Sequence, residues 1–427
     1  MSEQKNFVPK LRFPEFKNTE AWKEIRLIDS ADKKTKWSFI GGPFGSNLKS
    51  SDYVQNGIRV IQLQNIGDGQ FLDKYKIFTS INKANELLSN NIFPGEIILS
   101  KMGDPVGRAC LIPKTHERYV MCSDGIRLVV DELSYSKYFI YTLINSNQFR
   151  DLVDKTATGS TRKRIGLDDL KNLPMVVPKK KDEQQKIADC LSSLDGLIAA
   201  QNQKVQILKQ HKKSLMQQLF PAEGETVPKL RFPEFENDGE WQEKTIGQVA
   251  IYENGKAHEQ DISEYGRYVV VNSKFISTDG KIKKYTNEGN CLAKRNDILM
   301  VLSDVPNGRA IAKCFVVDEN DRYTVNQRIS KLTPTQVNSK FLFYLVNRNE
   351  YFLSFDDGVK QTNLKNDDVL NCPLLLPGNP IEQEKIAICL SLLEETIDTQ
   401  TQKTESLKNH KKGLMQQLFP SINEVDK

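Results

Sequence analysis

The residues best suited to binding chemistry in this chain form a basic run at residues 155–181. The run holds eight lysine and arginine residues against two acids, a local charge of +6 in a chain whose net charge is +5. Within it, residues 158–164 (TGSTRKR) combine a glycine turn, hydroxyls and three cations. Hydroxyls and cations bond phosphates, and arginine also fits the O6 and N7 acceptors of guanine. We therefore predict DNA contact, the alternative being a solvated turn with ordinary surface lysines.

A second loop stands 199 positions further along the chain, at residues 358–365 (GVKQTNLK), and offers amides that suit adenine. The full set of DNA-contact candidates consists of residues of these two loops and polar residues of other predicted loops and strand ends. In the first half these are Ser46, Asn47, Lys49, Gln64, Asn65, Lys101, Thr161, Arg162, Lys163 and Arg164. In the second half they are Lys256, His258, Asn272, Lys274, Arg309, Gln327, Lys360, Gln361 and Asn363.

Catalytic patterns do not accompany these loops. The four histidines form no HExxH motif, the seven cysteines include no CxxC pair, and there is no GxSxG elbow. Residues 103–108 (GDPVGR) lack the GKS/T ending of a phosphate loop and predict a tight turn between strands. We expect no catalytic residues, no metal site and no bound cofactor.

The sequence segments that we expect to position these loops occur twice in the chain. Residues 8–16 and 227–235 both read VPKLRFPEF, and residues 211–221 (HKKSLMQQLFP) return at 410–420 (HKKGLMQQLFP). Between these near-constant ends lie two divergent middles with short β-rich runs and a helix-like stretch each, at residues 136–154 and 338–355. Each middle predicts a compact mixed α/β domain.

These patterns divide the chain into consecutive segments. We predict a leader at 1–23, a first globular domain at 24–178, a central helix at 179–221, a repeated leader at 222–241, a second globular domain at 242–377, a C-terminal helix at 378–420 and a tail at 421–427.

The two predicted long helices, at 179–221 and 378–420, carry apolar residues at alternating spacings of four and three. In the first the seam is Ile187, Leu191, Leu194, Ile198, Val205, Leu208 and Leu215, and in the second it is Ile386, Leu390, Leu393, Ile397, Leu407 and Leu414. Gln201, Lys212, Gln400 and Lys411 interrupt the two seams at matching positions. A 3.5-residue period over about five heptads favours a coiled coil.

Two matched stripes in one chain favour pairing of the helices with each other over packing against their own domains. A helix of about 38 residues is ~57 Å long. Antiparallel pairing would place one globular domain at each end and create an internal pseudo-twofold axis.

Composition bounds the rest. The chain is 38% hydrophobic and 27% charged, which is typical of a globular protein. Its longest apolar runs fall far short of the ~20 residues that span a bilayer. No apolar signal core follows the polar N-terminus, and we expect a cytoplasmic protein without membrane contact.

Residues 183–198 (EQQKIADCLSSLDGLI) and 382–397 (EQEKIAICLSLLEETI), each followed by the LMQQLFP ending, carry a family resemblance. Together with GGPFGSNLK and QLQNIGDG in the first middle, they resemble the DNA specificity subunit of type I restriction–modification systems. The resemblance covers essentially the whole chain.

This resemblance implies that each globular domain is a target recognition domain, which reads half of a bipartite, asymmetric site in the major groove of double-stranded DNA. The paired helices would set the spacer and dock two methyltransferase subunits, and two restriction subunits would supply the motor and nuclease. S-adenosylmethionine, ATP and Mg would belong to those partners, and this chain would be non-catalytic. The alternatives are a coiled-coil scaffold that binds proteins, and a nuclease or methyltransferase that acts alone.

Overall fold

A computed structural model describes residues 7–258 and 262–420. The predicted tail at 421–427 and the first six residues of the predicted leader lie outside the described residues. The chain divides into two compact units, unit 1 with Met1–Asn202 and Gln402–Lys427, and unit 2 with Gln203–Thr401. Unit 1 is therefore assembled from two separate stretches of the chain, and each long helix contributes to both units.

Unit 1 combines short strands with short helices. Its strands are β1 (Lys23–Arg26), β2 (Phe39–Gly41), β3 (Tyr53–Val54), β4 (Ile58–Ile61), β5 (Ile77–Thr79), β6 (Asn91–Ile92), β7 (Ile97–Ser100), β8 (Ala109–Leu111), β9 (Tyr119–Met121), β10 (Gly125–Leu128) and β11 (Pro174–Val177). Its short helices are α1 (Ile81–Glu86), α2 (Lys137–Ile144), α3 (Asn147–Thr156) and α4 (Leu167–Asn172). The predicted mixed α/β class is confirmed.

The strands of unit 1 form a four-stranded antiparallel sheet, β2-β10-β7-β8, and a five-stranded sheet, β3-β5-β4-β9-β6. Within the second sheet β4 and β9 are parallel. A separate antiparallel pair, β1 with β11, joins the start of the globular part to its end.

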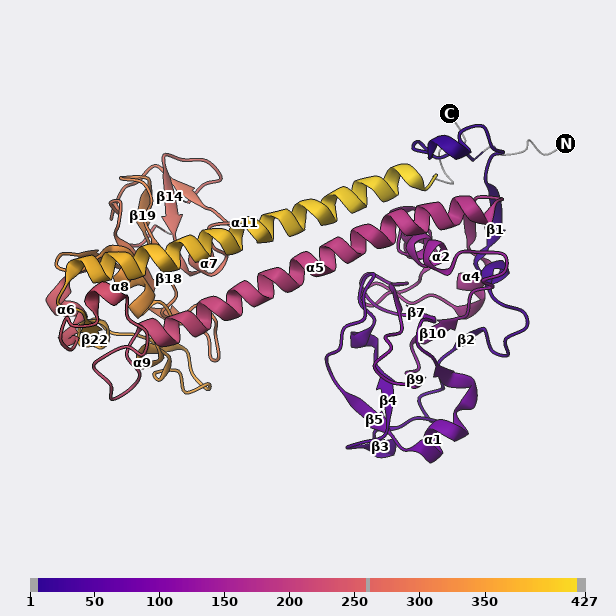
Figure 1. The fold of residues 1–427 in the computed structure, drawn as a ribbon, viewed down its shortest axis with the longest axis horizontal. Coiled ribbons are helices and arrows are strands. Elements are labelled where there is room, and N and C mark those ends of the chain that lie inside the picture. The colour runs from indigo at the N-terminus through magenta and orange to yellow at the C-terminus, as the bar shows by residue number, and fades with distance from the viewer. Residues whose placement is uncertain (1–6, 259–261, 421–427) are drawn as a thin grey trace. The chain divides into compact units, whose positions relative to one another are not determined.

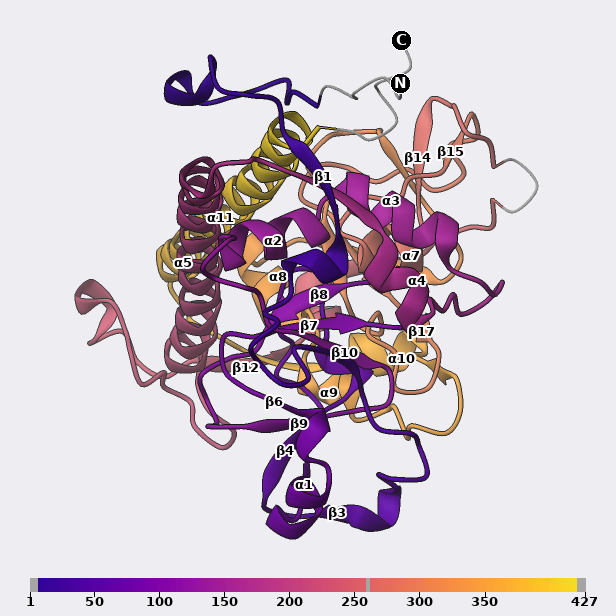
Figure 2. The ribbon, with the colours of Figure 1, turned by 90° about the vertical axis from the view of Figure 1, so that its right-hand side faces the viewer.

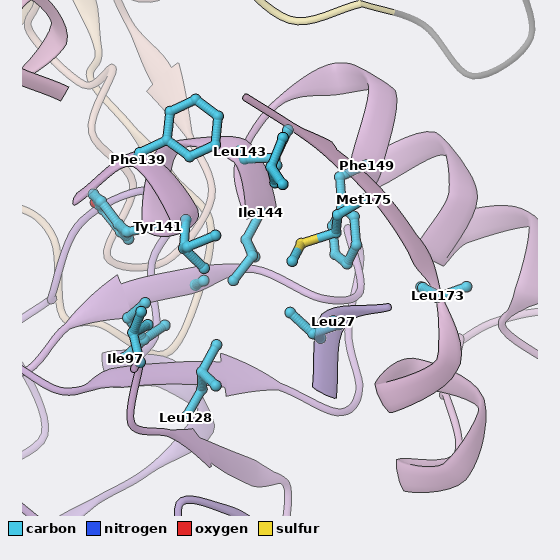
Figure 3. Packing of buried hydrophobic residues seen from close by; sticks show 14 of the residues in the cluster. Leu27, Ile97, Leu128, Phe139, Tyr141, Leu143, Ile144, Phe149, Leu173 and Met175 are labelled. Carbon is cyan, nitrogen blue, oxygen red and sulfur yellow. The ribbon is translucent and has the colours of Figure 1, made fainter. Parts of the chain in front are cut away.

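Strand β7 shows how the layers of unit 1 are held together. Successive side chains of a strand point to opposite faces. Ile97 and Leu99 accordingly belong to the hydrophobic core that contains Phe139 of α2, whereas Ile98 belongs to the core that contains Tyr119 of the five-stranded sheet. Figure 2 shows α2 above β7, β8 and β10, and Figure 3 shows the first of these cores from close by. The four-stranded sheet is thus buried on both faces, which explains its almost continuous apolar sequence.

Unit 2 repeats this organisation with different residues. Its strands are β12 (Gln242–Thr245), β13 (Ala250–Asn254), β14 (Tyr268–Val271), β15 (Tyr285–Thr286), β16 (Ile298–Val301), β17 (Ser303–Asp304), β18 (Cys314–Val316), β19 (Tyr323–Val325), β20 (Ile329–Pro334), β21 (Thr362–Asn363) and β22 (Pro373–Leu376). Its short helices are α6 (Ile246–Val249), α7 (Ser273–Ser277), α8 (Ser339–Val346), α9 (Glu350–Leu353) and α10 (Asn366–Leu370).

The sheets of unit 2 share the central connections of those of unit 1, although its second sheet has three strands instead of five and β17 forms a separate pair with β21. The four-stranded sheet has the order β13-β20-β16-β18, and β14 lies parallel to β19 in the order β15-β14-β19. Strand β16 alternates as β7 does, with Ile298 and Met300 in the core that contains Phe341 of α8 and Leu299 and Val301 in a second core. Two sequences with little identity in their middles therefore fold to the same four-stranded sheet and to the same parallel strand pair beside it.

The helix-like stretch predicted in each middle is helical in the structure, and it is divided into two helices. In unit 1 the break lies between α2 and α3, where the Asn145 side chain accepts a hydrogen bond from the Ala109 amide at 3.2 Å and Ser146 caps α3. In unit 2 Asn347 accepts from the Cys314 amide at 3.0 Å. Apolar periodicity does not reveal these breaks because the partners are distant in sequence.

The two long helices are α5 (Lys181–Leu219) and α11 (Pro380–Leu418) (Figure 1). Both end two residues before the proline of the LFP sequence, and so inside the predicted segments 179–221 and 378–420. Helix α11 begins at Pro380, which is tolerated because the first position of a helix needs no amide hydrogen. Within the described parts of the chain, no helix is long and apolar enough to cross a membrane.

Every predicted seam residue of α5 and α11 is buried or half-buried. Within unit 1, Ile187 and Leu191 of α5 share a hydrophobic core with Leu418 near the end of α11. Within unit 2, Leu390 of α11 shares a core with Leu219 at the end of α5. The start of each helix therefore packs in the same unit as the end of the other.

The lysines that interrupt the seams form ion pairs with the other helix. Within unit 1 the Lys411 ammonium lies 2.6 Å from Asp195, and within unit 2 the Lys212 ammonium lies 2.8 Å from Glu394. Each lysine thus finds an acid at a position where an apolar residue would continue the stripe.

A tyrosine from the globular part supports each of these ion pairs. The Tyr138 hydroxyl donates to Asp195 at 2.5 Å, and the Tyr344 hydroxyl donates to Glu394 at 2.9 Å. Burial, with the neighbouring acid, raises the pKa of both phenols, so they remain donors at neutral pH. Each unit is therefore tied to the polar part of its helix pair.

The repeated leaders hold the helix ends in place. Arg12 donates from Nε and Nη2 to both carboxylate oxygens of Glu183 at 2.7 and 2.8 Å, and the Trp22 indole donates to the same carboxylate at 3.0 Å. Arg231 makes the same fork with Glu382, at 2.8 Å for both bonds. The matching forks account for the arginine of each leader and for the glutamate in the first turn of each long helix.

Glu183→Gln is expected to destabilise unit 1 by about 3–5 kcal/mol, because it leaves a buried arginine without its counter-charge. The side chains of Arg12 and Glu183 are only 7% and 2% exposed. Thermal unfolding followed by calorimetry measures the change. Glu20→Gln is the control, since Glu20 pairs with Lys179 on the surface; equal unfolding temperatures for the two variants would contradict the prediction.

Candidate nucleic-acid interface

In unit 1 several loops leave from one end of the four-stranded sheet. Gly41 at the end of β2 pairs with Ile126 of β10, and Ser100 at the end of β7 pairs with Gly125 at the start of β10. The loop 42–49, the turn 103–108 and the turn that carries Asp124 all start or finish here. The predicted turn at 103–108 is confirmed as a connection between β7 and β8.

The basic loop 158–164 is bonded to this end of the sheet by its backbone. The Gly103 amide donates to the Lys163 carbonyl at 3.0 Å, and the Ile165 amide donates to the Lys101 carbonyl at 3.0 Å. Gly159 has φ +102°, a left-handed conformation that favours glycine. The fold thus brings the TGSTRKR segment beside Lys101, which is another of the DNA-contact candidates.

The parallel strands of the five-stranded sheet end at the same place. The Cys122 amide, just after β9, donates to the Ile61 carbonyl at the end of β4 at 2.9 Å. A short 3-10 turn, Leu63–Asn65, follows, and leaves Gln64 exposed. Asn65 instead is fully buried and donates to the Leu72 carbonyl at 2.8 Å, so its amide serves the loop and not the surface.

Most candidate side chains of unit 1 are accessible. The exposed ones are Ser46, Asn47, Lys49, Gln64, Thr161, Arg162 and Arg164, and the half-buried ones are Lys101 and Lys163. Two of the cations are paired, Lys163 with Asp154 at 2.6 Å and Arg164 with Asp124 at 2.9 Å. The structure therefore places a group of cations and hydroxyls at one end of the sheets of unit 1.

Unit 2 builds the equivalent place from different residues. Lys256, just after β13, forms a bridge with Asn326, just after β19, and the Asn326 amide donates to the Val271 carbonyl at the end of β14 at 3.1 Å. The loop 358–365 joins this end through β21, in which Asn363 pairs with Ser303 of β17.

The accessible candidates of unit 2 are Lys256, Lys274, Arg309, Gln327, Lys360, Gln361 and Asn363. Gln361 is oriented by a 2.6 Å hydrogen bond from its Nε2 to the Ser303 hydroxyl. The amides of Lys360 and Val359 donate to the Asp357 carboxylate, and these hydrogen bonds hold its pKa below the usual value.

Two candidates of unit 2 have structural roles instead. Asn272 caps α7 by accepting from the Phe275 amide at 2.9 Å. His258 is 1% exposed, and its two ring nitrogens lie 2.7 Å from the Lys256 carbonyl and 2.9 Å from the Thr324 hydroxyl. Sequence alone could not separate these side chains from exposed neighbours of the same types.

The loops of the two units present different side chains from equivalent positions. Arg164 forms a bridge with Met102 in unit 1, and Asn363 pairs with Ser303 in unit 2. The offset of 199 residues between the loops, noted in the sequence, therefore coincides with a structural equivalence. A common scaffold that carries variable polar side chains can discriminate between ligands of one kind.

Two residues at this place escaped the sequence analysis. Asp124 and Arg328 each precede the central strand of the four-stranded sheet, β10 or β20, in a turn with no motif. The Asp124 carbonyl accepts from the Lys101 amide at 2.7 Å, and the Arg328 carbonyl accepts from the Leu302 amide at 3.0 Å. Only the register of the sheets reveals that they are equivalent.

The geometry defines a two-domain recognition protein, with polar loops on matched scaffolds. Across the described ranges 7–258 and 262–420, no group of three or more His, Cys, Asp or Glu residues is arranged to hold a metal ion. The family model described as the type I restriction modification DNA specificity domain matches residues 22–210 and 238–409, and the chain belongs to this family. It is a DNA specificity subunit of a type I restriction–modification system, the non-catalytic component, and the resemblance noted in the sequence is confirmed.

Specificity subunits of other organisms are similar to this chain in sequence and in fold. The MjaIX specificity subunit of Methanocaldococcus jannaschii is 22% identical over 93% of this chain and 94% of its own length. The MjaVIII specificity subunit of the same organism is 24% identical, and there the match spans 47% of this chain and about half of the relative, 46%. The crystal structure of a type I restriction–modification S subunit from M. genitalium superposes with a TM-score of 0.60 at 18% identity, and covers 97% of this chain and all of that one.

Proposed function

We propose that each unit reads one half of an asymmetric, bipartite site in the major groove of double-stranded DNA. The loops at the sheet end of each unit would make the contacts, through Lys101 and residues 161–164 in unit 1 and residues 360–363 in unit 2. One observation carries this proposal: the two units place different hydrogen-bonding side chains at equivalent positions of one scaffold. Reading different half-sites requires that combination.

The chemistry of the exposed groups fits a division of labour. Lysines and hydroxyls position a protein on phosphates without reading sequence, whereas arginine and amide side chains read base edges. In unit 1 the exposed hydroxyl of Thr161 and the cation of Lys101 suit phosphates, and the loop 158–164 also supplies arginine side chains of the type that bonds guanine. In unit 2 Gln361 and Asn363 suit adenine. The two half-sites are therefore expected to differ in composition.

We further propose that α5 and α11 form an antiparallel coiled coil, which sets the unread spacer between the half-sites and relates the two units by a pseudo-twofold axis. Support comes from the buried seam and from the ion pairs Lys411–Asp195 and Lys212–Glu394, which join opposite ends of the two helices within each unit. A helix of 39 residues extends ~58 Å, more than the ~34 Å of one DNA turn.

Four residues inserted after Gln201 and four after Gln400 are expected to lengthen the spacer by one or two base pairs. One added turn contributes about 5–6 Å, against the ~3.4 Å rise of a base pair. Mapping of methylated adenines reports the spacer directly. A seven-residue insertion at both points keeps the phase of the seam and is the control, with about three base pairs expected; an unchanged spacer in both variants would contradict the spacer role.

The partners follow from the same proposal. Two methyltransferase subunits would dock on the helix pair and two restriction subunits would join them. S-adenosylmethionine would be bound by the methyltransferase subunits, and ATP and Mg by the restriction subunits. The absence of catalytic motifs in this chain supports that assignment.

A map of methylated adenines in cells with and without this gene tests the proposed function. We expect a bipartite motif that disappears with the gene, and DNA binding by the assembled methyltransferase that weakens steeply with salt. A scaffold that binds only proteins would give neither result, and methylation by the purified chain alone would identify an independent methyltransferase.

A further inference from the structure

The ion pair between Arg164 and Asp124 differs from the other charged contacts of the candidate interface. Nη2 of Arg164 donates to Oδ1 of Asp124 at 2.9 Å, with the sulfur of Met102 3.8 Å from the same nitrogen. The arginine side chain is 53% exposed, whereas the aspartate side chain is 18% exposed. An accessible guanidinium is thus attached at one corner to a largely covered acid.

Both partners stand on backbone that is fixed by hydrogen bonds. Arg164 and Thr158 exchange backbone bonds of 2.8 and 2.9 Å. The Asp124 carbonyl accepts from the Lys101 amide at 2.7 Å, and the next residue, Gly125, donates its amide to Cys122 at 3.1 Å and accepts from the Gly42 amide at 2.7 Å. The backbone at both ends of this ion pair is therefore fixed before any DNA arrives, and the hydrogen bond to Asp124 restricts where the guanidinium can lie.

A guanidinium held at one corner keeps most of its reading capacity. Arginine has five N–H donors in a planar fork. Nη2 of Arg164 donates to Asp124, and its second N–H has only the sulfur of Met102, a weak acceptor that a guanine oxygen or nitrogen can replace. The remaining donors match the O6 and N7 acceptors of guanine, and a fork that is already oriented loses less freedom per hydrogen bond.

We propose that Arg164 reads a guanine in the half-site of unit 1, and that Asp124 is the positioning residue that aims it. This assignment rests on the proposed function, since it presumes that unit 1 reads one half-site. It goes further because it names Arg164, among several cations, as the residue that contacts the base, and Asp124 as the residue that orients Arg164.

Neighbouring cations lack this combination. Lys163 is a point charge, and it pairs with Asp154 on the surface, where the two side chains are 39% and 52% exposed. Arg162 is exposed, and its side chain forms no hydrogen bond or ion pair within residues 7–258 and 262–420, so its guanidinium has no fixed direction. Both suit phosphate contact, which needs charge but little orientation.

Unit 2 supplies a natural comparison. Asn363 stands where unit 1 has Arg164, and Arg328 stands where unit 1 has Asp124. The acid that would aim an arginine is replaced by a cation, and the arginine by an amide. The inference therefore includes a difference between the half-sites: guanine faces Arg164, and adenine is expected opposite Asn363.

The test uses the full chain assembled with its methyltransferase subunits and duplexes that carry the recognised site. Each guanine in the half-site of unit 1 is replaced in turn by 7-deazaguanine, which lacks the N7 acceptor. We expect the wild type to lose affinity by roughly threefold to tenfold at one guanine, because 7-deazaguanine keeps O6 and removes one of the two acceptors of a bidentate contact. Arg164→Gln should lose that sensitivity, and Arg164→Lys, which keeps the charge, should lose most of it.

Asp124→Asn should reduce the sensitivity at the same guanine several-fold while Arg164 is still present. Asp154→Asn is the matched control, because it removes one acid beside Lys163 and changes the net charge equally, and it should keep full sensitivity. Guanines in the half-site of unit 2 report whether each variant is folded. Wild-type sensitivity in Arg164→Gln, equal behaviour of the two aspartate variants, or a half-site of unit 1 without guanine would overturn the assignment. Absence of any sequence preference in the wild-type complex would instead overturn the proposed function.

Discussion

Replacing residues 24–178 with the corresponding segment of another type I specificity subunit is expected to change one half of the recognised DNA site and to leave the other half unchanged. The physical reason is that the cores of the two units are separate. The clusters that fill unit 1 contain Phe139, Ile61 and Val60, and none of their residues belongs to unit 2. The loops of unit 2 therefore keep their scaffold after the exchange.

The structure also sets a condition for a working chimera. The incoming segment must supply an aromatic residue in place of Phe139, whose ring lies 5.9 Å from Trp22 and 5.6 Å from Phe419, both outside the exchanged segment. The methylated-adenine motif of the chimera is the measurement, and exchange of residues 242–377 is the reciprocal control. A change in both halves of the motif would show that the units do not read independently.

Phe419→Ala is expected to cost unit 1 about 3–5 kcal/mol, the range for a large aromatic side chain removed from a core. Phe419 is 1% exposed, and its carbonyl accepts from the Gln148 side chain at 2.9 Å. This loss is a large fraction of the free energy of unfolding of a whole domain, which is only about 5–15 kcal/mol. A residue at the end of the second long helix would thus be needed by the first globular domain.

Hydrogen exchange of the α2 amides measures this effect, and an acceleration of roughly a hundredfold or more is expected. Phe220→Ala is the matched variant, because Phe220 is the equivalent residue of unit 2 and packs 5.5 Å from Phe341. Phe220 is only half-buried, so a smaller acceleration is expected, and in α8 rather than α2. Unchanged hydrogen exchange of the α2 amides in Phe419→Ala would contradict this structural role of Phe419 in unit 1.

Local and repeated patterns were enough to predict much of the molecule. The spacing of four and three along residues 187–215 and 386–414 predicts long helices with one buried face, and both helices carry it. The duplicated leaders and tails indicate two similar halves, and the family resemblance rests on those same segments. These signals can be read because they arise from residues a few positions apart or from identical strings.

Burial, and contacts between distant segments, had to come from the fold. Asn65 and Asn47 are the same residue type in predicted loops, yet one is buried in three hydrogen bonds and the other is exposed. Asp124 lies in an unremarked turn and meets Arg164 only because β10 and the basic loop share one end of a sheet. Hydrogen-bond partners forty or more residues apart leave no periodic trace in the chain.

The same division explains the two halves of the function. Helix periodicity, turn residues and the repeat are encoded within short windows, so the class of protein and its two-part construction follow from the amino-acid order. Which cation is aimed at a base, and which asparagine only holds a loop, depends on strand register and burial, which exist only once β-strands far apart in the chain have paired.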